Sequence, residues 1–124
     1  MPNPPLISTL ESYLNLTTSR EHAISANMAN VDTPGYQTRD INFGSELNKA
    51  INETATQSED GSEAPQLSPV VRQVRGLMER PDGNNVSLDR EGLLMAETQL
   101  QYQIGTQLVK HEFHQILSAI NGGS

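Results

Sequence analysis

The sequence predicts a mainly α-helical protein whose two long amphipathic terminal helices form an antiparallel, coiled-coil-like pair. Two observations carry this prediction: apolar residues recur at helical spacing towards both ends of the 124-residue chain, and turn-forming residues crowd the region between them. In that middle region we expect a short extended or hairpin segment and a disordered loop. With 35% hydrophobic and 4% aromatic residues, the chain can bury only a modest core, as one structural unit.

The composition excludes several classes of function. The formal net charge is −7, whereas binding to nucleic acid or to an anionic membrane surface requires clustered lysine and arginine. Cysteine is absent, which excludes a disulfide framework, a thiolate nucleophile and a cysteine-zinc site. The N-terminus has neither a basic region nor a long apolar run, so we expect no cleaved signal peptide and no direct membrane insertion.

The first predicted helix covers residues 3–31 and is about 40 Å long at 1.5 Å per residue. Steps of three and four residues alternate along its seam, which is the spacing of a coiled coil. The seam suits the core of an ordinary globular domain as well as a contact with another chain. It consists of Ile7, Leu10, Leu14, Thr17, Glu21, Ile24, Met28 and Val31, and its middle positions are polar.

Residues 32–35 are predicted to end this helix. Pro34 pushes the preceding residue out of the α region, and Gly35 permits a positive φ. Beyond this stop, residues 36–43 are predicted to be extended and residues 45–51 to form a short helix.

The second half of the middle region contains a weakly structured stretch and a turn. Residues 53–66 include four acidic residues, no basic residue and almost no large apolar side chain, which is typical of a mobile loop. Three valines between residues 70 and 74 favour a short strand, which is too small to be stable unless other residues cover it. Residues 80–85 predict a tight turn.

The second long helix is predicted over residues 87–121 and is about 50 Å long. Asp89 and Glu91 lie in its first turn, where acidic residues interact favourably with the helix dipole. Its apolar residues form two neighbouring rows, which together are wider than a two-stranded seam requires and therefore predict more than one neighbour. One row is Met95, Tyr102, Val109, Phe113, Ile116 and Ile120, and the other is Leu93, Leu100, Ile104 and Leu108.

The sequence contains no cluster that predicts catalysis, a cofactor or a metal site. His111 and His114 are three residues apart, whereas helical zinc pairs are four apart, and a third ligand is not evident. The turn at Asp82 resembles the start of a calcium loop, but Ser87 and Leu93 stand where that loop needs glycine and glutamate. We interpret these side chains as solvated, and we expect a protein that is not an enzyme.

A run of eleven residues, Ala26–Tyr36, resembles the signature of the flagellar axial proteins, the family of the rod and hook. In that family an asparagine-rich helix end runs into Thr-Pro-Gly-Tyr. A second motif, which begins at the Asp82–Asn85 turn and continues to Gln103, is similar to that of proximal-rod members. The residues that match the first motif are Asn27, Asn30, Thr33, Pro34, Gly35 and Tyr36.

The resemblance implies a structural subunit of the proximal rod of the bacterial flagellar basal body, needed for motility. It implies as partners other copies of the chain, other rod proteins, and the inner-membrane ring adaptor with the type III export gate. It also implies a periplasmic location reached through the type III apparatus without a cleaved signal. For the asparagines it suggests that they satisfy exposed carbonyls or fix the register against a neighbour.

Our leading hypothesis is self-assembly through the two terminal helices. It divides the chain into an N-terminal assembly helix at 1–35, a middle segment at 36–86 and a C-terminal assembly helix at 87–124. An alternative is an export-apparatus adaptor or chaperone-like binder of axial subunits, which would stay soluble in the cytosol. The predicted interface, within the chain and across neighbours, consists of Leu10, Leu14, Ile24, Met28, Val31, Leu100, Ile104, Leu108, Phe113, Ile116 and Ile120.

Overall fold

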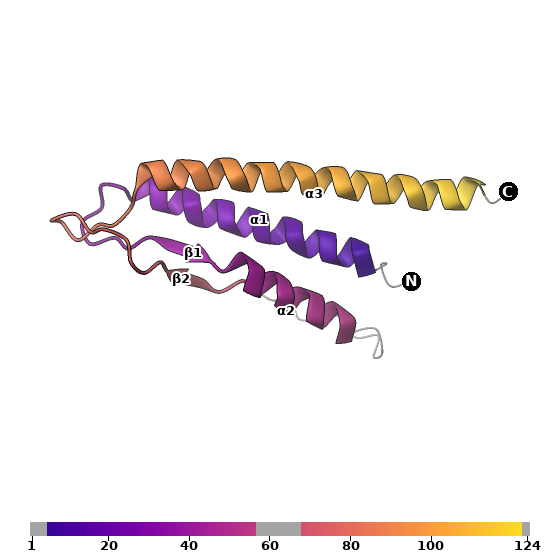
Figure 1. Ribbon diagram of the computed structural model, residues 1–124, viewed down its shortest axis with the longest axis horizontal. Coiled ribbons are helices and arrows are strands. Elements are labelled where there is room, and N and C mark those ends of the chain that lie inside the picture. Colours follow the sequence, from indigo (N-terminus) through magenta and orange to yellow (C-terminus); the bar gives the residue numbers. More distant parts are fainter. Residues whose placement is uncertain (1–4, 57–67, 123–124) are drawn as a thin grey trace.

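The computed structural model describes residues 5–56 and 68–122. Figure 1 shows an elongated molecule in which α1 lies between α3 on one side and the strands with α2 on the other. The start of α1 and the end of α3 lie at the same end of the molecule. The prediction of a mainly helical fold with paired terminal helices is confirmed. The elements in chain order are α1 (Pro5–Ala29), β1 (Arg39–Ile41), α2 (Phe43–Thr56), β2 (Val71–Gln73) and α3 (Leu88–Gly122).

Two contacts fix the antiparallel register of α1 and α3. Towards one end, Asn27 Nδ2 donates a hydrogen bond to Glu91 Oε2 at 3.0 Å. Further along, Gly105 lies so close to α1 that a Cβ atom on it would be 2.7 Å from Leu14 Cδ2. At this register Pro5 lies opposite Phe113, so α3 continues past the start of α1 (Figure 1).

The most deeply buried residues of α3 are polar or small, and the large apolar side chains beside them are only half-buried. The buried residues of α3 are Glu91, Thr98 and Gly105, which follow one another at the seven-residue spacing of a coiled coil. Most of the apolar core comes from α1 instead. The buried apolar residues of the described chain are Ile7, Leu10, Leu16, Ala23 and Ile24 on α1, together with Ile41 and Val86.

The strands and α2 cover the face of α1 that lies away from α3. β1 and β2 pair antiparallel, with Asp40 opposite Arg72 in the middle of the pairing. The Asn42 side chain caps α2 by accepting a hydrogen bond from the Ser45 amide at 3.1 Å. Phe43 then packs edge-to-face on Tyr13 of α1, with ring centroids 5.4 Å apart. Burial at this contact raises the pKa of Tyr13 above its ordinary value.

Some predicted boundaries were wrong. The short helix expected at 45–51 extends over Phe43–Thr56, because the Asn42 cap starts it earlier. Residues 53–56, which we expected in a mobile loop, are therefore helical, and the rest of that loop lies outside the described residues. The extended segment expected at 36–43 is a strand only at β1, where β2 supplies a partner.

No helix in the described ranges is both long enough and apolar enough to cross a membrane.

Candidate assembly site

The two motifs of the sequence lie against one another at the head of the molecule, the end where α1 stops and α3 begins (Figure 1). The Gly35 amide donates to the Asp82 carbonyl at 2.9 Å. Gly35 and Gly83 have φ values of 76° and 84°, and a Cβ on Gly83 would lie 3.4 Å from Gly35 Cα. Glycine is needed at both positions because of the positive φ and the close approach. We call residues 27–36 and 82–85 the motif junction.

Asn84 holds the junction together. Its side chain is 0% exposed, and its Nδ2 donates to the carbonyls of Asn30, Val31 and Thr33 at 2.8, 3.0 and 2.8 Å. Its Oδ1 accepts a hydrogen bond from the Val86 amide at 2.8 Å. These three carbonyls belong to the turn that follows α1, so this one amide ties that turn to a segment about fifty residues away.

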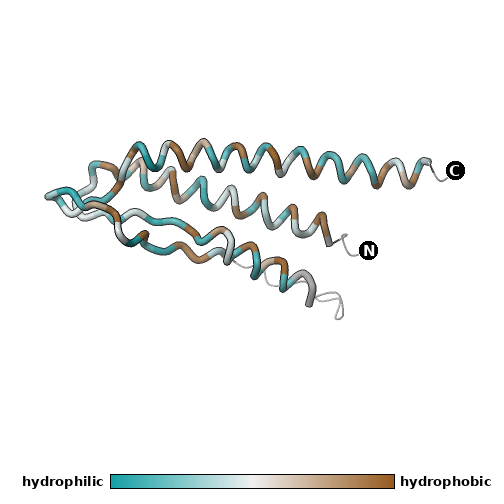
Figure 2. The backbone as a smooth tube through the Cα atoms, in the orientation of Figure 1, coloured by the Kyte–Doolittle hydropathy of each residue, from teal (hydrophilic) through white to brown (hydrophobic). Residues whose placement is uncertain are grey.

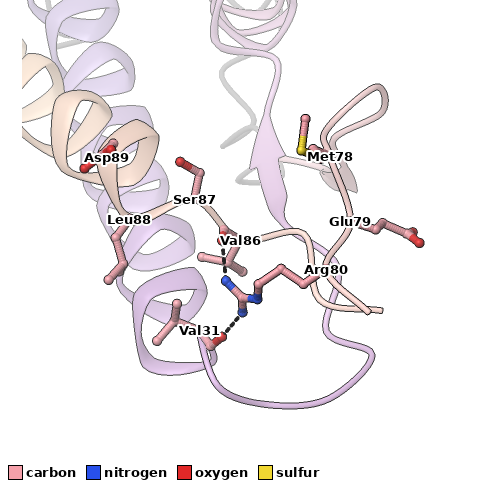
Figure 3. A pocket seen from close by; sticks show the side chains of 8 residues that line it. All are labelled: Val31, Met78, Glu79, Arg80, Val86, Ser87, Leu88 and Asp89. Carbon is pink, nitrogen blue, oxygen red and sulfur yellow. Dashed lines mark hydrogen bonds between the residues drawn. The ribbon is translucent and has the colours of Figure 1, made fainter. Parts of the chain in front are cut away.

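Arg80 adds a second donor to the same turn. Its guanidinium donates to the carbonyl of Val31 and, at 3.1 Å, to the carbonyl of Val86. Figure 3 shows this guanidinium between the two carbonyls, with its side chain reaching in from the loop that precedes the turn. A cation near a helix C-terminus also interacts favourably with the helix dipole. The loop before α3 therefore stabilises the end of α1.

Asn27 connects three elements at the base of the junction. The side chain is 1% exposed, and Nδ2 donates to Glu91 Oε2 at 3.0 Å and to the Arg39 carbonyl at 2.8 Å. Its Oδ1 accepts from the Arg39 amide at 3.0 Å and from the Tyr36 hydroxyl at 3.2 Å. Every hydrogen-bonding position of this buried amide is therefore used, as the energetics of buried polar groups require.

The Glu91 carboxylate is fully buried and needs compensation for its charge. Arg90 Nη1 donates to Glu91 Oε1 at 2.7 Å, and Asn27 donates to the other oxygen. Arg90 also lies 4.0 Å from Asp40 on β1, which itself accepts two hydrogen bonds of 3.2 Å from Arg20 on α1. The resulting polar network joins α1, β1 and α3 in one relative arrangement.

The other motif residues lie on the outer side of the junction. Asn30 Nδ2 donates to the Ala26 carbonyl at 2.8 Å, and the Thr33 hydroxyl donates to Asn30 Oδ1 at 3.0 Å. Pro34 and Gly35 are exposed. We expected the Tyr36 hydroxyl to be solvated, but it bonds to Asn27, because the turn folds the ring back onto α1.

Sequence reasoning left several structural residues without a role. Asn84 and Arg80 were seen only as part of a turn, Glu91 only as a first-turn acid, and Gly105 was not singled out. One signal was available: Glu91, Thr98 and Gly105 recur every seven residues along α3, and they alternate with Met95, Tyr102 and Val109 of the first apolar row. A polar or small residue at each of these positions indicates a close or hydrogen-bonded helix contact.

The predicted interface residues divide into two groups in the structure. On α1, Leu10 and Ile24 are buried within the chain, and Leu14, Met28 and Val31 are half-buried. On α3, Ile116 is half-buried, and the rest of the group is exposed. Figure 2 shows hydrophobic positions recurring along all of α3, including the part past α1. The exposed fractions are 57% for Leu100, 49% for Ile104, 48% for Leu108, 51% for Phe113 and 68% for Ile120.

In the part of the chain that the structure describes, no three histidine, aspartate or glutamate side chains are grouped to hold a metal ion. His111 and His114 are exposed, and the ring of His111 lies 3.1 Å from Gln115 Nε2.

Comparison with known proteins identifies the family. A family model described as "Flagella basal body rod protein" matches residues 7–37, which cover nearly all of α1 and the first half of the motif junction. The flagellar basal body rod protein FlgB of Salmonella typhimurium is 35% identical, over 92% of this chain and 91% of its own length. The chain belongs to the FlgB family of flagellar basal body rod proteins. The FlgB proteins of Escherichia coli and Buchnera aphidicola are 34% and 30% identical, over 92% and 90% of this chain and 91% of their own lengths.

Membership of the FlgB family establishes the general function. The chain is a structural subunit of the flagellar basal-body rod and so part of the motility apparatus. The alternative of an export adaptor or chaperone-like binder is not favoured, since the matching proteins are rod components.

Proposed function

We propose that the chain builds the proximal rod by packing the apolar rows of α3 against neighbouring subunits, while the motif junction holds the subunit itself together. The supporting observation is that different residues of α3 are buried against α1 and exposed to solvent. Its buried line of Glu91, Thr98 and Gly105 meets α1, and large apolar residues stand exposed beside that line. An exposed apolar surface of this extent usually marks a partner.

The free energy gained by burying large apolar side chains favours assembly through these rows. Burying one large aliphatic or aromatic side chain contributes about 1.5–3 kcal/mol. Exposed side chains of this kind on α3 include Leu93, Leu100, Ile104, Leu108, Phe113, Leu117 and Ile120. A few of them at one contact offset the cost of association when several neighbours bind each subunit. α1 contributes less, because Leu10 and Ile24 are already buried inside the chain.

The proposal includes the cellular setting. The subunit contacts other copies of itself and other rod proteins, and at the base of the rod it meets the inner-membrane ring adaptor and the type III export gate. It reaches the periplasm through that gate without a cleaved signal. In this scheme residues 1–35 and 87–124 are the assembly helices, and residues 36–86 form the segment that links and braces them.

Replacement of one exposed apolar residue tests the interface. We expect Ile104→Asp to abolish rod assembly and swimming while export of the subunit continues. Ile104 is 49% exposed in the isolated chain, so a carboxylate there remains hydrated until a neighbour approaches, and the monomer keeps its fold. The measurement is recovery of the variant in purified basal bodies, together with motility in soft agar.

Gln103→Asp is the matched control, since it adds the same charge at an exposed polar position on a different side of the same helix. The control variant should enter basal bodies and support swimming. Normal swimming of the Ile104→Asp strain would refute the role given to this row. Recovery of the wild-type chain only in the soluble cytosolic fraction would refute the rod function itself.

A further inference from the structure

One line along α3 carries four large apolar side chains that are exposed in the single chain. Together with Glu97, they follow Arg90 at steps of three or four residues, so all of them lie on one side of the helix. Arg90 lies 4.0 Å from Asp40 on β1, which places this line on the strand side of α3. We call the four residues the knob row: Leu93, Leu100, Ile104 and Leu108, which are 71%, 57%, 49% and 48% exposed.

α1 has an outer face that carries polar and small side chains. Its residues also follow one another at steps of three or four, and all of them are exposed. Arg20 and Asn27 bond to β1 from the opposite side of the helix, so the outer face points away from the strands. The residues of the α1 outer face are Glu11, Asn15, Thr18, His22, Ser25 and Ala29.

We propose that the knob row of one copy packs on the α1 outer face of the next copy, with the two helices antiparallel. This inference rests on the proposed function, and it names which apolar row of α3 meets a neighbour and which surface covers it. The two surfaces point to opposite sides of the molecule. A copy that binds through one surface therefore still presents the other, so that further copies add to the assembly.

The shapes of the two surfaces suit one another. The knob row is about 22 Å long and the α1 outer face about 27 Å, at 1.5 Å per residue. Small side chains such as Thr18 and Ser25 leave room for larger side chains of a facing helix to fit between them. Large residues already meet a small one where the two helices pair inside the chain, since Leu14 and Tyr13 of α1 lie against Gly105 of α3.

An antiparallel alignment brings the two surfaces into register over their whole length. Leu100 is placed opposite His22, and both helices advance by 1.5 Å per residue from there. The apolar residues of the knob row then meet uncharged residues at both ends and in the middle. The further pairs are Leu93 with Ala29, Ile104 with Thr18, and Leu108 with Asn15.

Charge complementarity supports this direction. In the antiparallel alignment Glu97 lies within one helical turn of His22, and Lys110 lies level with Glu11. A parallel alignment of the same two surfaces would instead place Leu93 on Glu11 and bring Glu97 within a turn of that like charge. Exposed ion pairs add little to affinity, so the charges select the direction and the burial of the knob row supplies the binding.

Cysteine pairing tests the contact, because the chain has no cysteine of its own. His22→Cys and Leu100→Cys are introduced together into the full chain, which is then oxidised both in purified concentrated form and inside basal bodies. Within one chain the two side chains point to opposite sides of the α1 and α3 pair, too far apart for a disulfide. We expect non-reducing gels to show a shift from 13.6 kDa to dimers and higher multimers.

Matched variants distinguish docking from collision. His22→Cys with Gln99→Cys moves the second thiol by about 100° around α3 and off the knob row, and we expect the multimers to be lost. Leu100→Cys alone should remain monomeric, because the knob row does not meet its own counterpart in this arrangement.

A bulky residue on the α1 outer face provides a second test. Thr18→Trp, added to the His22 and Leu100 pair, occupies the place of Ile104 from the neighbour, so the multimers should disappear. Thr18 is exposed, so the helical circular dichroism of the chain should stay unchanged. Asn48→Trp is the control, since it adds the same bulk at an exposed position of α2 and should leave the multimers in place.

The outcomes separate this inference from the proposed function. Equal multimers from the Leu100 and Gln99 pairs, dimers from Leu100→Cys alone, or no multimers in either preparation would overturn the docking. If the double variant is present in basal bodies without multimers, the rod function stands and the docking fails. If multimers form in solution but the chain is absent from basal bodies, the docking stands and the rod function fails.

Discussion

Asn84 shows how a single amide can brace the turn that follows a long helix. Pro34 and Gly35 direct the chain away from α1, and Asn84 donates to three carbonyls of that turn, those of Asn30, Val31 and Thr33. These carbonyls also accept hydrogen bonds from the Thr33 amide, Arg80 and the Tyr36 amide, so Asn84 adds to contacts within the turn. The two motifs of the sequence therefore form one hydrogen-bonded structure.

At the residue scale we predict that Asn84→Ala lowers the free energy of unfolding by about 2–4 kcal/mol, because it removes three hydrogen bonds to the turn after α1 and the acceptor of the buried Val86 amide. Urea unfolding of the full chain, followed by circular dichroism, measures this loss. Asn48→Ala is the control, since Asn48 is exposed on α2. Equal losses for the two variants would contradict this role of Asn84.

At the scale of elements, the contact between α1 and α3 depends on the absence of a side chain. A Cβ on Gly105 would lie 2.7 Å from Leu14 and 3.1 Å from the ring of Tyr13. Phe43 packs against that ring, so Tyr13 cannot easily move aside. The helices approach closely here because of this glycine and not because of interlocking apolar side chains.

We predict that Gly105→Ala destabilises the chain by about 1–3 kcal/mol, because overpacking outweighs the gain in helix propensity. Gly92→Ala, on the same helix, has nothing within 4 Å of the added Cβ and should stabilise it by about 0.5–1 kcal/mol. Thermal unfolding of the two variants beside the wild type measures the difference. A stabilising Gly105→Ala would show that the close approach does not hold the helices together.

The sequence was sufficient to predict the elements but not their partners. The helices at 5–29 and 88–122 follow from periodicity and from Pro34 and Gly35, which are local signals. The pairing of β1 with β2 joins segments about thirty residues apart, and it depends on contacts such as Arg20 with Asp40 that no periodicity encodes. The exposed row of Leu93, Leu100, Ile104 and Leu108 could be listed in advance, whereas the half-burial of Met95, Val109 and Ile116 in the other row could be seen only with the register set by Asn27 and Glu91.

At the scale of the whole molecule, many large apolar side chains, above all on α3, are exposed in the single chain. We predict that the purified chain associates as its concentration rises, and that sodium sulfate strengthens this association because it favours apolar burial. Analytical ultracentrifugation across concentrations, with and without sulfate, measures the average mass. Weakening of the association by added salt would instead indicate that ion pairs hold the copies together.

The motif junction gives the molecule two ends of unequal rigidity. Hydrogen bonds and buried charged groups are concentrated around Asn27, Asn84 and Glu91. By contrast, the part of α3 after Phe113 extends beyond the start of α1. Local opening is least costly where such contacts are fewest, so fraying begins at the end of α3 and stops before the junction. The isolated subunit therefore holds one end in a fixed shape, and we expect the other end to become ordered only against a neighbour.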